Sequence, residues 1–326
     1  MKKGTLYILA LLLLPALFMA GCKKDLALKK LNTLTDSAAH HITVSTMTTG
    51  YYNLVAPGEN GSVYILRGYA DTIYKVDSAG NKTVFYTPPA PTLADTAVNI
   101  LTALTTDSSG NVYTLSFSKL AAKIIKISPA GSATTYIDGL VSYKNAGGII
   151  NIKIDNAGNI YFTNYNGIYK AVPGGAISQI STVQTASFAI NDAGDLIIAH
   201  DNTIGKITPG GAETIIAGTG SYGSTDGPAA TATFNIIHEI ACDNKGNIFV
   251  SEVKNGSTDQ IRVITNTNKV YTLISSLTGH ADGAISIAKI GTPSFLVTDA
   301  AGSLYFSEGN NDDGPASNDI RKITFK

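Results

Sequence analysis

A histidine and a glutamate stand next to each other at His238-Glu239, within an apolar run typical of a strand. Imidazole and carboxylate groups can bind a metal ion or transfer protons. Side chains of neighbouring strand residues point to opposite faces, so this pair is not expected to act together. The other candidates, His200 and His280, lie in separate segments, and the sequence shows neither a nucleophile–base–acid triad nor a glycine-rich phosphate loop. We therefore assign no catalytic residue, and enzyme activity is the less favoured interpretation.

Six polar segments combine Asp or Asn with Gly, and they offer a second possible chemistry, the binding of calcium. They are Asn60-Gly61, 107–111, 155–159, 191–195, 243–247 and 299–303. A hand-type calcium loop needs carboxylates at alternating positions and a final Glu, which these segments lack. Glycine supplies positive φ and Asp or Asn bonds the local backbone, so the segments predict tight hairpin turns without a metal.

A short phrase, Ile-x-Lys-Ile or a near copy, follows each of these turns. The copies are 73–76, 124–127, 168–171, 204–207, 261–264 and 320–323. Seven residues after the leading Ile, the first five copies have Gly80, Gly131, Gly175, Gly211 and Asn268, whereas the chain ends before that point in the sixth. A repeated unit of this size cannot bury its apolar face alone, so the units must pack on one another.

Each unit is expected to form four short strands, which makes the fold class all-β. A β-rich run follows each turn, and a fourth strand follows the phrase in the first five units. The sixth unit has no fourth strand, but a run of the same character, residues 42–47, precedes the first unit. We expect this run to complete the last unit, because that joins the two ends and removes an exposed sheet edge.

The fifth unit carries a family resemblance. Its Asp-x-x-Gly-Asn-Ile-Phe-Val-Ser-Glu stretch (243–252), followed by Ile-Arg-x-Ile-Thr (261–265), resembles the NHL repeat. Residues 217–235 resemble the connector between such repeats, and 279–283 are a degenerate copy. The resemblance covers all six units. It implies a six-bladed β-propeller of four-stranded antiparallel blades, closed by the strand at about 42–47.

In such a ring, equivalent positions surround a central channel. Counting eight residues back from each turn glycine gives Asn53, Thr102, Ile150, Ala186, His238 and Ser294 at the mouth. The next positions inward are Leu54, Ala103, Asn151, Ser187, Glu239 and Phe295. Asn53, Asn151, His238 and Glu239 are our candidate binding residues there.

Related six-bladed propellers include lactonases and lyases that hold calcium or zinc at the channel mouth. A metal needs three or more converging ligands, and only His238 and Glu239 qualify here. We expect no cofactor; calcium or zinc belongs to the alternative, a metal-dependent lactonase-like hydrolase or lyase with its site at the mouth.

The loops opposite the turns vary most. The leading Ile of the phrase follows the turn glycine by 12, 14, 10, 10, 15 and 18 residues in the six units, and each of these segments contains one such loop. Because variable loops on a rigid scaffold often carry binding groups, we add Asn310, Asp312 and Asp313 in the longest loop as candidates. Solvated loops without function are the alternative.

The amino terminus resembles a bacterial lipoprotein signal. A basic start precedes an apolar run, 6–18, that is too short to span a bilayer and ends in Met19-Ala20-Gly21-Cys22. The resemblance implies a signal peptide at 1–21, a lipidated Cys22 with a flexible tether at 22–40, and a propeller at 41–326. Lys23 replaces the Asp of inner-membrane lipoproteins, so we expect outer-membrane sorting with the leaflet left open. An ordinary secretory peptide is the alternative.

The charge balance limits the classes of partner that the sequence supports. Lys plus Arg and Asp plus Glu are both 24, giving a net charge of zero, which argues against nucleic acid as a partner. We expect a membrane-anchored propeller that binds an envelope protein, a peptide or a glycan. A structural lipoprotein of an envelope assembly is a third possibility.

Overall fold

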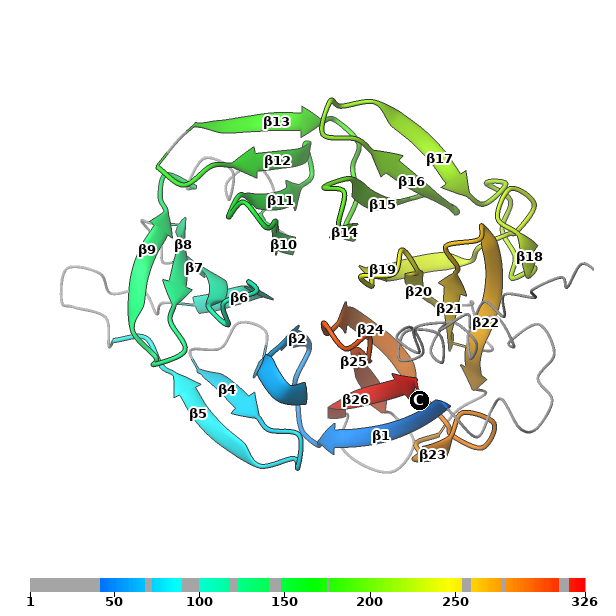
Figure 1. The fold of residues 1–326 in the computed structure, drawn as a ribbon, viewed down its shortest axis with the longest axis horizontal. Coiled ribbons are helices and arrows are strands. Elements are labelled where there is room, and N and C mark those ends of the chain that lie inside the picture. The colour runs from blue at the N-terminus through cyan, green and yellow to red at the C-terminus, as the bar shows by residue number, and fades with distance from the viewer. Residues whose placement is uncertain are drawn as a thin grey trace, which may run out of the picture.

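The computed structural model forms a ring of six β-sheets around a central channel (Figure 1). It describes residues 42–67, 72–89, 100–117, 122–140, 148–149, 151–174, 176–253, 259–276, 279–310 and 317–325. Four strands make each of the first four sheets, and a two-residue fifth strand is added to each of the last two. The predicted all-β, six-bladed propeller is confirmed.

Successive segments of the chain form successive blades, each running outward from the channel. Blade 1 comprises β2 (Leu54–Pro57), β3 (Val63–Leu66), β4 (Ile73–Val76) and β5 (Lys82–Tyr86). Blade 2 comprises β6 (Ile100–Thr106), β7 (Val112–Phe117), β8 (Ala122–Ile127) and β9 (Ala133–Ile137). Blade 3 comprises β10 (Asn151–Ile154), β11 (Ile160–Asn164), β12 (Gly167–Ala171) and β13 (Ile177–Ser181).

Blade 4 comprises β14 (Phe188–Ile190), β15 (Leu196–His200), β16 (Thr203–Ile207) and β17 (Glu213–Ala217). Blade 5 comprises β19 (Ile236–Cys242), β20 (Ile248–Val253), β21 (Asp259–Ile264) and β22 (Lys269–Ser276), with β18 (Gly227–Pro228) at its edge. Blade 6 comprises β24 (Thr292–Thr298), β25 (Leu304–Asn310), β26 (Ser317–Phe325) and β1 (Ile42–Thr48), with β23 (Gly283–Ala284) at its edge.

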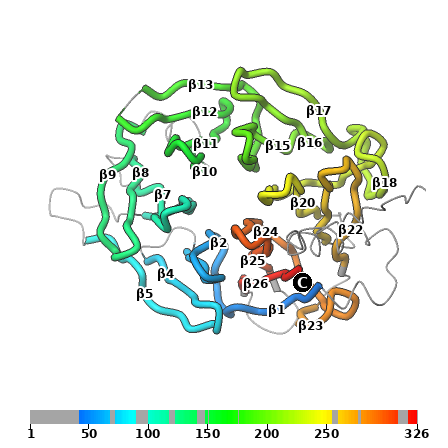
Figure 2. Tube along the Cα trace, in the orientation of Figure 1, coloured from blue at the N-terminus to red at the C-terminus, as the bar shows by residue number. Residues whose placement is uncertain are grey.

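The amino-terminal strand closes the ring, as predicted. β1 pairs antiparallel with β26 along the register from Ile42↔Phe325 to Thr48↔Ile320, and the two strands lie side by side in the trace (Figure 2). On its outer side, β1 also pairs with β23. A clasp of side chains adds to this closure, because both the amide and the hydroxyl of Thr46 donate hydrogen bonds to Asp282 at 2.9 Å.

The six polar segments form tight turns, as predicted. Their glycines all have positive φ, between 74° and 83°. In the second turn, for example, one carboxylate oxygen of Asp107 accepts hydrogen bonds from the amides of Ser109 and Asn111 at 2.9 Å. Asn268, which stands where four other copies have Gly, adopts the same left-handed conformation with φ 59°. These turns define the turn face of the ring, and the opposite side is called the loop face below.

The repeated phrase forms the middle of each blade. The leading Ile is fully buried in all six copies: Ile73, Ile124, Ile168, Ile204, Ile261 and Ile320 are each 0 % exposed. In the first five blades, the pairing of the third with the fourth strand shifts register directly after this Ile. A repeated bulge of this kind increases the local twist, which suits blades that radiate from a common axis.

Two arginines in the second phrase position are fully buried, which was not predicted. Arg262 donates to the buried Glu252 at 3.0 Å and to Asp226 at 2.9 Å. Arg321 in the last blade bonds Glu308 and Asp282 in the same way. Each network ties a blade connector to the middle of its blade.

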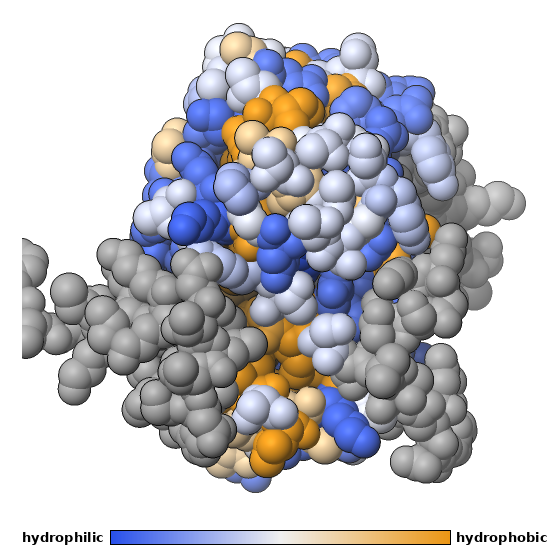
Figure 3. Space-filling view, turned by 90° about the vertical axis from the view of Figure 1, so that its right-hand side faces the viewer, coloured by the Kyte–Doolittle hydropathy of each residue, from blue (hydrophilic) through white to orange (hydrophobic). Residues whose placement is uncertain are grey.

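The outer surface is mixed in character. Seen from the β18–β22 side, polar and apolar residues are interspersed over the coloured atoms (Figure 3). No helix in the described part of the chain is long and apolar enough to cross a bilayer.

Candidate binding site in the central channel

The innermost strands of all six blades surround a cavity of about 140 Å³. The residue five positions before each turn glycine contributes to its wall. These residues are Ala56, Thr105, Lys153, Ala189, Ala241 and Val297. The repeat therefore builds one ring of equivalent positions, and only one of them carries a charge.

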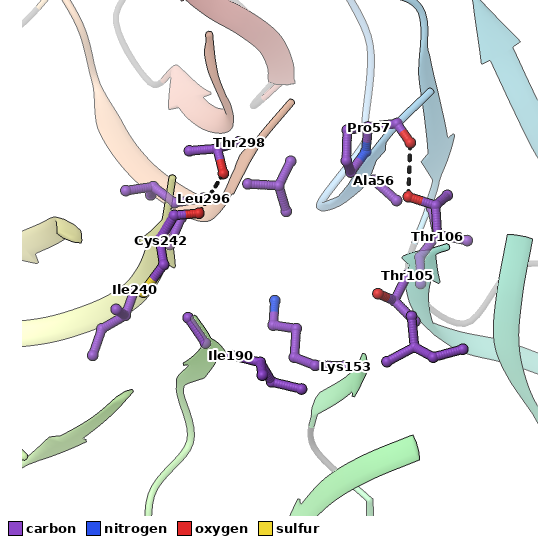
Figure 4. Close-up of a pocket in the computed structure, with 15 residues that line it drawn as sticks. Ala56, Pro57, Thr105, Thr106, Lys153, Ile190, Ile240, Cys242, Leu296 and Thr298 are labelled. Atoms are coloured by element: carbon purple, nitrogen blue, oxygen red, sulfur yellow. Dashed lines mark hydrogen bonds between the residues drawn. The ribbon is translucent and has the colours of Figure 1, made fainter. Parts of the chain in front are cut away.

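Lys153 is the single charged residue among those that line the cavity. Its side chain extends from β10 into the open space at the centre of the ring (Figure 4). Within the described residues, no hydrogen bond or ion pair satisfies its ammonium group. The hydroxyls of Thr106 and Thr298 are occupied by the backbone carbonyls of Pro57 and Cys242, at 2.8 and 2.6 Å.

Two residues closer to the loop face, three blades join in a polar cluster. The hydroxyl of Ser187 donates to Oε1 of Glu239 at 2.8 Å, and the amide of Asn151 donates to the same oxygen at 3.4 Å. Ser187 in turn accepts a hydrogen bond from the backbone amide of Ile240 at 2.8 Å. The structure thus brings together two of the candidates, Asn151 and Glu239, with Ser187 of the same ring of positions.

Glu239 is only 5 % exposed. Burial raises the pKa of its carboxyl group, while the charge of Lys153 and the hydrogen bond from Ser187 oppose that shift. Burial therefore makes ionisation of this carboxyl group harder than in water, and the surrounding donors and the Lys153 charge offset part of that effect.

His238 and Asn53 lie apart from this cluster. The pairing of β19 with β20 passes from Ile237↔Glu252 to Glu239↔Ser251, so His238 is the extra residue of a bulge. Its side chain is exposed, whereas that of Glu239 is buried. Asn53 is half-buried and directly precedes β2. The two neighbours His238 and Glu239 therefore lie in different environments, one exposed on the bulge and the other buried.

The remaining candidates are the three residues of the longest loop and the predicted lipidation site. Asp312, Asp313 and Cys22 fall outside the described residues, and Asn310 is described only as the last residue of β25. Their predicted roles stay predictions.

Two further cavities open on the turn face. One, of about 580 Å³, lies between the turns of blades 6, 1 and 2, and the other, of about 290 Å³, lies between those of blades 2 and 3. In the smaller one, Tyr113 donates to Asp107 at 2.8 Å and the ammonium of Lys126 lies over the Tyr113 ring. Thr106 lines both cavities and the channel cavity as well. The three spaces therefore adjoin.

The mouth residues that the structure describes do not fit a metal ion. The described residues contain no group of three His, Cys, Asp or Glu side chains placed to hold an ion. One oxygen of the Glu239 carboxylate already accepts two hydrogen bonds, and His238 is the exposed extra residue of the bulge. We therefore derive no chemistry through a metal.

Lys153 and Ser187 were not among the predicted site residues. Ser187 was placed at the right position in the ring but was not selected. Lys153 could have been found by aligning the six turn glycines and reading five residues back, where it is the only charge. Cys242 lies half-buried in the cavity wall. Burial raises the pKa of its thiol to about 12.

Comparison with known proteins supports the fold. No protein-family model matches this sequence, and no curated protein does. Among solved structures, an auxiliary nutrient binding protein from Bacteroides ovatus has a TM-score of 0.62 at 15% identity, over 87% of this chain and 77% of that one. A gluconolactonase from Xanthomonas campestris has a TM-score of 0.60 at 12% identity, over 90% and 94% of the two chains.

A streptogramin B lyase is similar as well, with a TM-score of 0.53 at 14% identity over 87% of this chain and 98% of that one. At these identities the likeness shows a common propeller fold. One of these three proteins binds nutrients, one is a gluconolactonase and one is a lyase, so the fold alone does not select a function.

Proposed function

We propose that this chain is a lipid-anchored, NHL-like propeller of the cell envelope that binds a protein, peptide or glycan. The observation that carries the proposal is the state of the channel mouth. Glu239, the carboxylate best placed for catalysis, is buried and held by Ser187 and Asn151. His238, its neighbour, is exposed on the bulge. Among the described residues, acid, base and metal ligands do not converge there, which favours binding over chemistry.

Membrane anchoring is the second part of the proposal. Acyl chains on Cys22 would hold the ring at the outer membrane through the tether at 22–40, each buried methylene contributing about 0.8 kcal/mol. The likeness to nutrient-binding propellers supports a role in capture.

The partner would contact the loop face. Here the loops between the second and third strands differ in length, and the longest contains Asn310, Asp312 and Asp313. Amide and carboxylate groups suit the hydroxyls of a glycan or the amides and cations of a peptide.

A triple variant of these residues tests the partner site. The full chain in detergent would be probed against glycan and peptide arrays, and against envelope proteins by cross-linking. Replacing Asn310, Asp312 and Asp313 by Ala should abolish the bound signal. A matched control on the turn face, with the exposed Ser108, Ser109 and Asn156 replaced by Ala, should retain it. Equal binding by both variants would contradict the proposed surface.

A metal-dependent hydrolase or lyase is the second candidate. It is favoured by the raised pKa of Glu239 and by the likeness to a gluconolactonase and a streptogramin lyase. Lactone turnover that needs calcium or zinc and is lost in Glu239→Gln would establish it in place of the binding role.

A further inference from the structure

We infer that the central channel is a binding site for a small monocarboxylate, recognised by the ammonium group of Lys153. This site goes beyond the proposed function, since it is separate from the loop face and takes a different class of ligand. It depends on the cavity and on the single charge within it.

The charge of Lys153 lacks a partner in the described structure. Its ammonium group lies half-buried at the centre of the ring, surrounded by neutral residues from the other five blades (Figure 4). Removing an ionised group from water is costly unless an opposite charge or hydrogen bonds compensate it. An anion that entered the cavity would supply both, because charge-assisted hydrogen bonds are among the strongest in proteins.

Glu239 is a carboxylate that interacts with Lys153 electrostatically, but it does not provide the ammonium group with a hydrogen bond. Glu239 and Lys153 interact electrostatically, but no hydrogen bond or ion pair joins these two described residues. The Glu239 oxygen that is bonded accepts from Ser187 and Asn151, not from Lys153. The bonded oxygen of Glu239 is thus held by Ser187 and Asn151, and the ammonium group of Lys153 has no hydrogen-bond or ion-pair partner among the described residues.

The size and lining of the cavity select the ligand class. An apolar cavity of roughly 150 Å³ holds benzene, so about 140 Å³ admits a carboxylate with a short carbon chain. Leu104, Ile190 and Leu296 line the cavity and suit such a chain. The Thr105 hydroxyl, turned toward the same space, offers a second hydrogen bond (Figure 4). One cation in a partly apolar space favours a singly charged carboxylate over phosphate.

The ligand has a route of entry from the turn face. Pro57 and Thr106 line both the channel cavity and the adjoining space of about 580 Å³. A small anion would thus reach Lys153 without displacing the polar cluster at Glu239, which lies two residues further along the inner strands.

Ligand-observed NMR on the full chain in detergent tests the site. Propionate would be titrated at constant ionic strength, with propionamide as the neutral molecule of the same shape and inorganic phosphate as the competing anion. Constant ionic strength removes general screening effects. Three variants would be compared: Lys153→Met, Lys153→Arg and Lys206→Met. Lys206 is a matched control, since it lies on a middle strand outside the channel, near Asp195.

Saturable propionate binding is expected for the wild-type chain, for Lys153→Arg and for Lys206→Met. In Lys153→Met we expect binding weaker by roughly tenfold or more, because a hydrogen bond to a charged group is lost. The melting temperature shows whether each variant is folded, and the comparison of propionate with propionamide on the wild-type chain tests the charge should Lys153→Met not fold. Equal affinity for propionamide, tighter binding of phosphate, or unchanged affinity in a folded Lys153→Met would overturn the inference. Loop-face binding is unaffected by these variants, so the two proposals fail independently.

Discussion

Closure of the ring by β1 makes a quantitative prediction for the double variant Ile42→Ala/Val44→Ala. Both side chains are 1 % exposed and belong to one core cluster with Ile323 and Phe325. Truncating a buried Ile to Ala costs about 2–5 kcal/mol. Val→Ala removes two carbons at about 0.8 kcal/mol each, plus a cavity contribution. The expected loss is about 4–6 kcal/mol, less any coupling between the neighbouring sites.

Urea unfolding followed by tyrosine fluorescence and far-ultraviolet circular dichroism measures this loss. The chain has 16 Tyr and no Trp, so tyrosine is the natural probe. Since domains are stable by only about 5–15 kcal/mol, the double variant should unfold at much lower urea or fail to fold. Ser45→Ala, on the exposed face of the same strand, is the matched control and should change the midpoint little. A double variant within about 1 kcal/mol of wild type would refute closure by β1.

Four further predictions follow from single sites. Because burial raises the pKa of Glu239, its ionised form opposes folding, and the stability of the protein should fall as pH rises through the folded pKa. In thermal melts Glu239→Gln should be more stable than wild type at pH 8, and this difference should vanish toward acid pH. The reverse order of stability would contradict the burial effect. Arg262→Met leaves Glu252 buried without its cation, and it should lower the free energy of unfolding in urea by about 3–5 kcal/mol. Adding Glu252→Gln should restore part of this free energy. An unchanged free energy of unfolding in Arg262→Met would show that the pair is not coupled. Gly167→Ala should lower the melting temperature, since the new Cβ would lie 2.1 Å from a backbone oxygen of the neighbouring strand at φ +131°, and an unchanged melt would disprove that contact. Cys22→Ala should move the chain from the membrane fraction to the soluble fraction, and continued membrane retention would argue against lipidation.

The fold was predictable because its landmarks are local. A turn needs glycine at a fixed place, and each third strand needs a large buried apolar residue. A glycine equivalent to Gly110 and an isoleucine equivalent to Ile124 therefore recur in every unit. Residues 42–47 have the strand pattern but precede the first unit, and their predicted place in the last blade is confirmed by the pairing of β1 with β26. The exchange of Gly for Asn268 was also readable, because both residues tolerate the left-handed conformation.

The site was less predictable because it depends on contacts between blades. Counting from the turns placed Asn151 and Glu239 in one ring, but only the structure shows that Ser187 joins them. Lys153 was overlooked because a lysine on a strand is usually a solvated residue. Arg262 donates hydrogen bonds to the backbone carbonyls of Thr225 and Thr233 in the connector before its blade. This contact joins residues far apart in the sequence, so no local sequence pattern predicts it.

A thermal-shift screen of the full chain tests most directly whether this propeller binds a partner or uses a metal for chemistry. Glycans, peptides, calcium and zinc would be compared on the wild-type chain and on Glu239→Gln. The binding role predicts that a glycan or peptide raises the melting temperature of both proteins and that neither metal does. A rise with calcium or zinc in the wild-type chain that disappears in Glu239→Gln would contradict it.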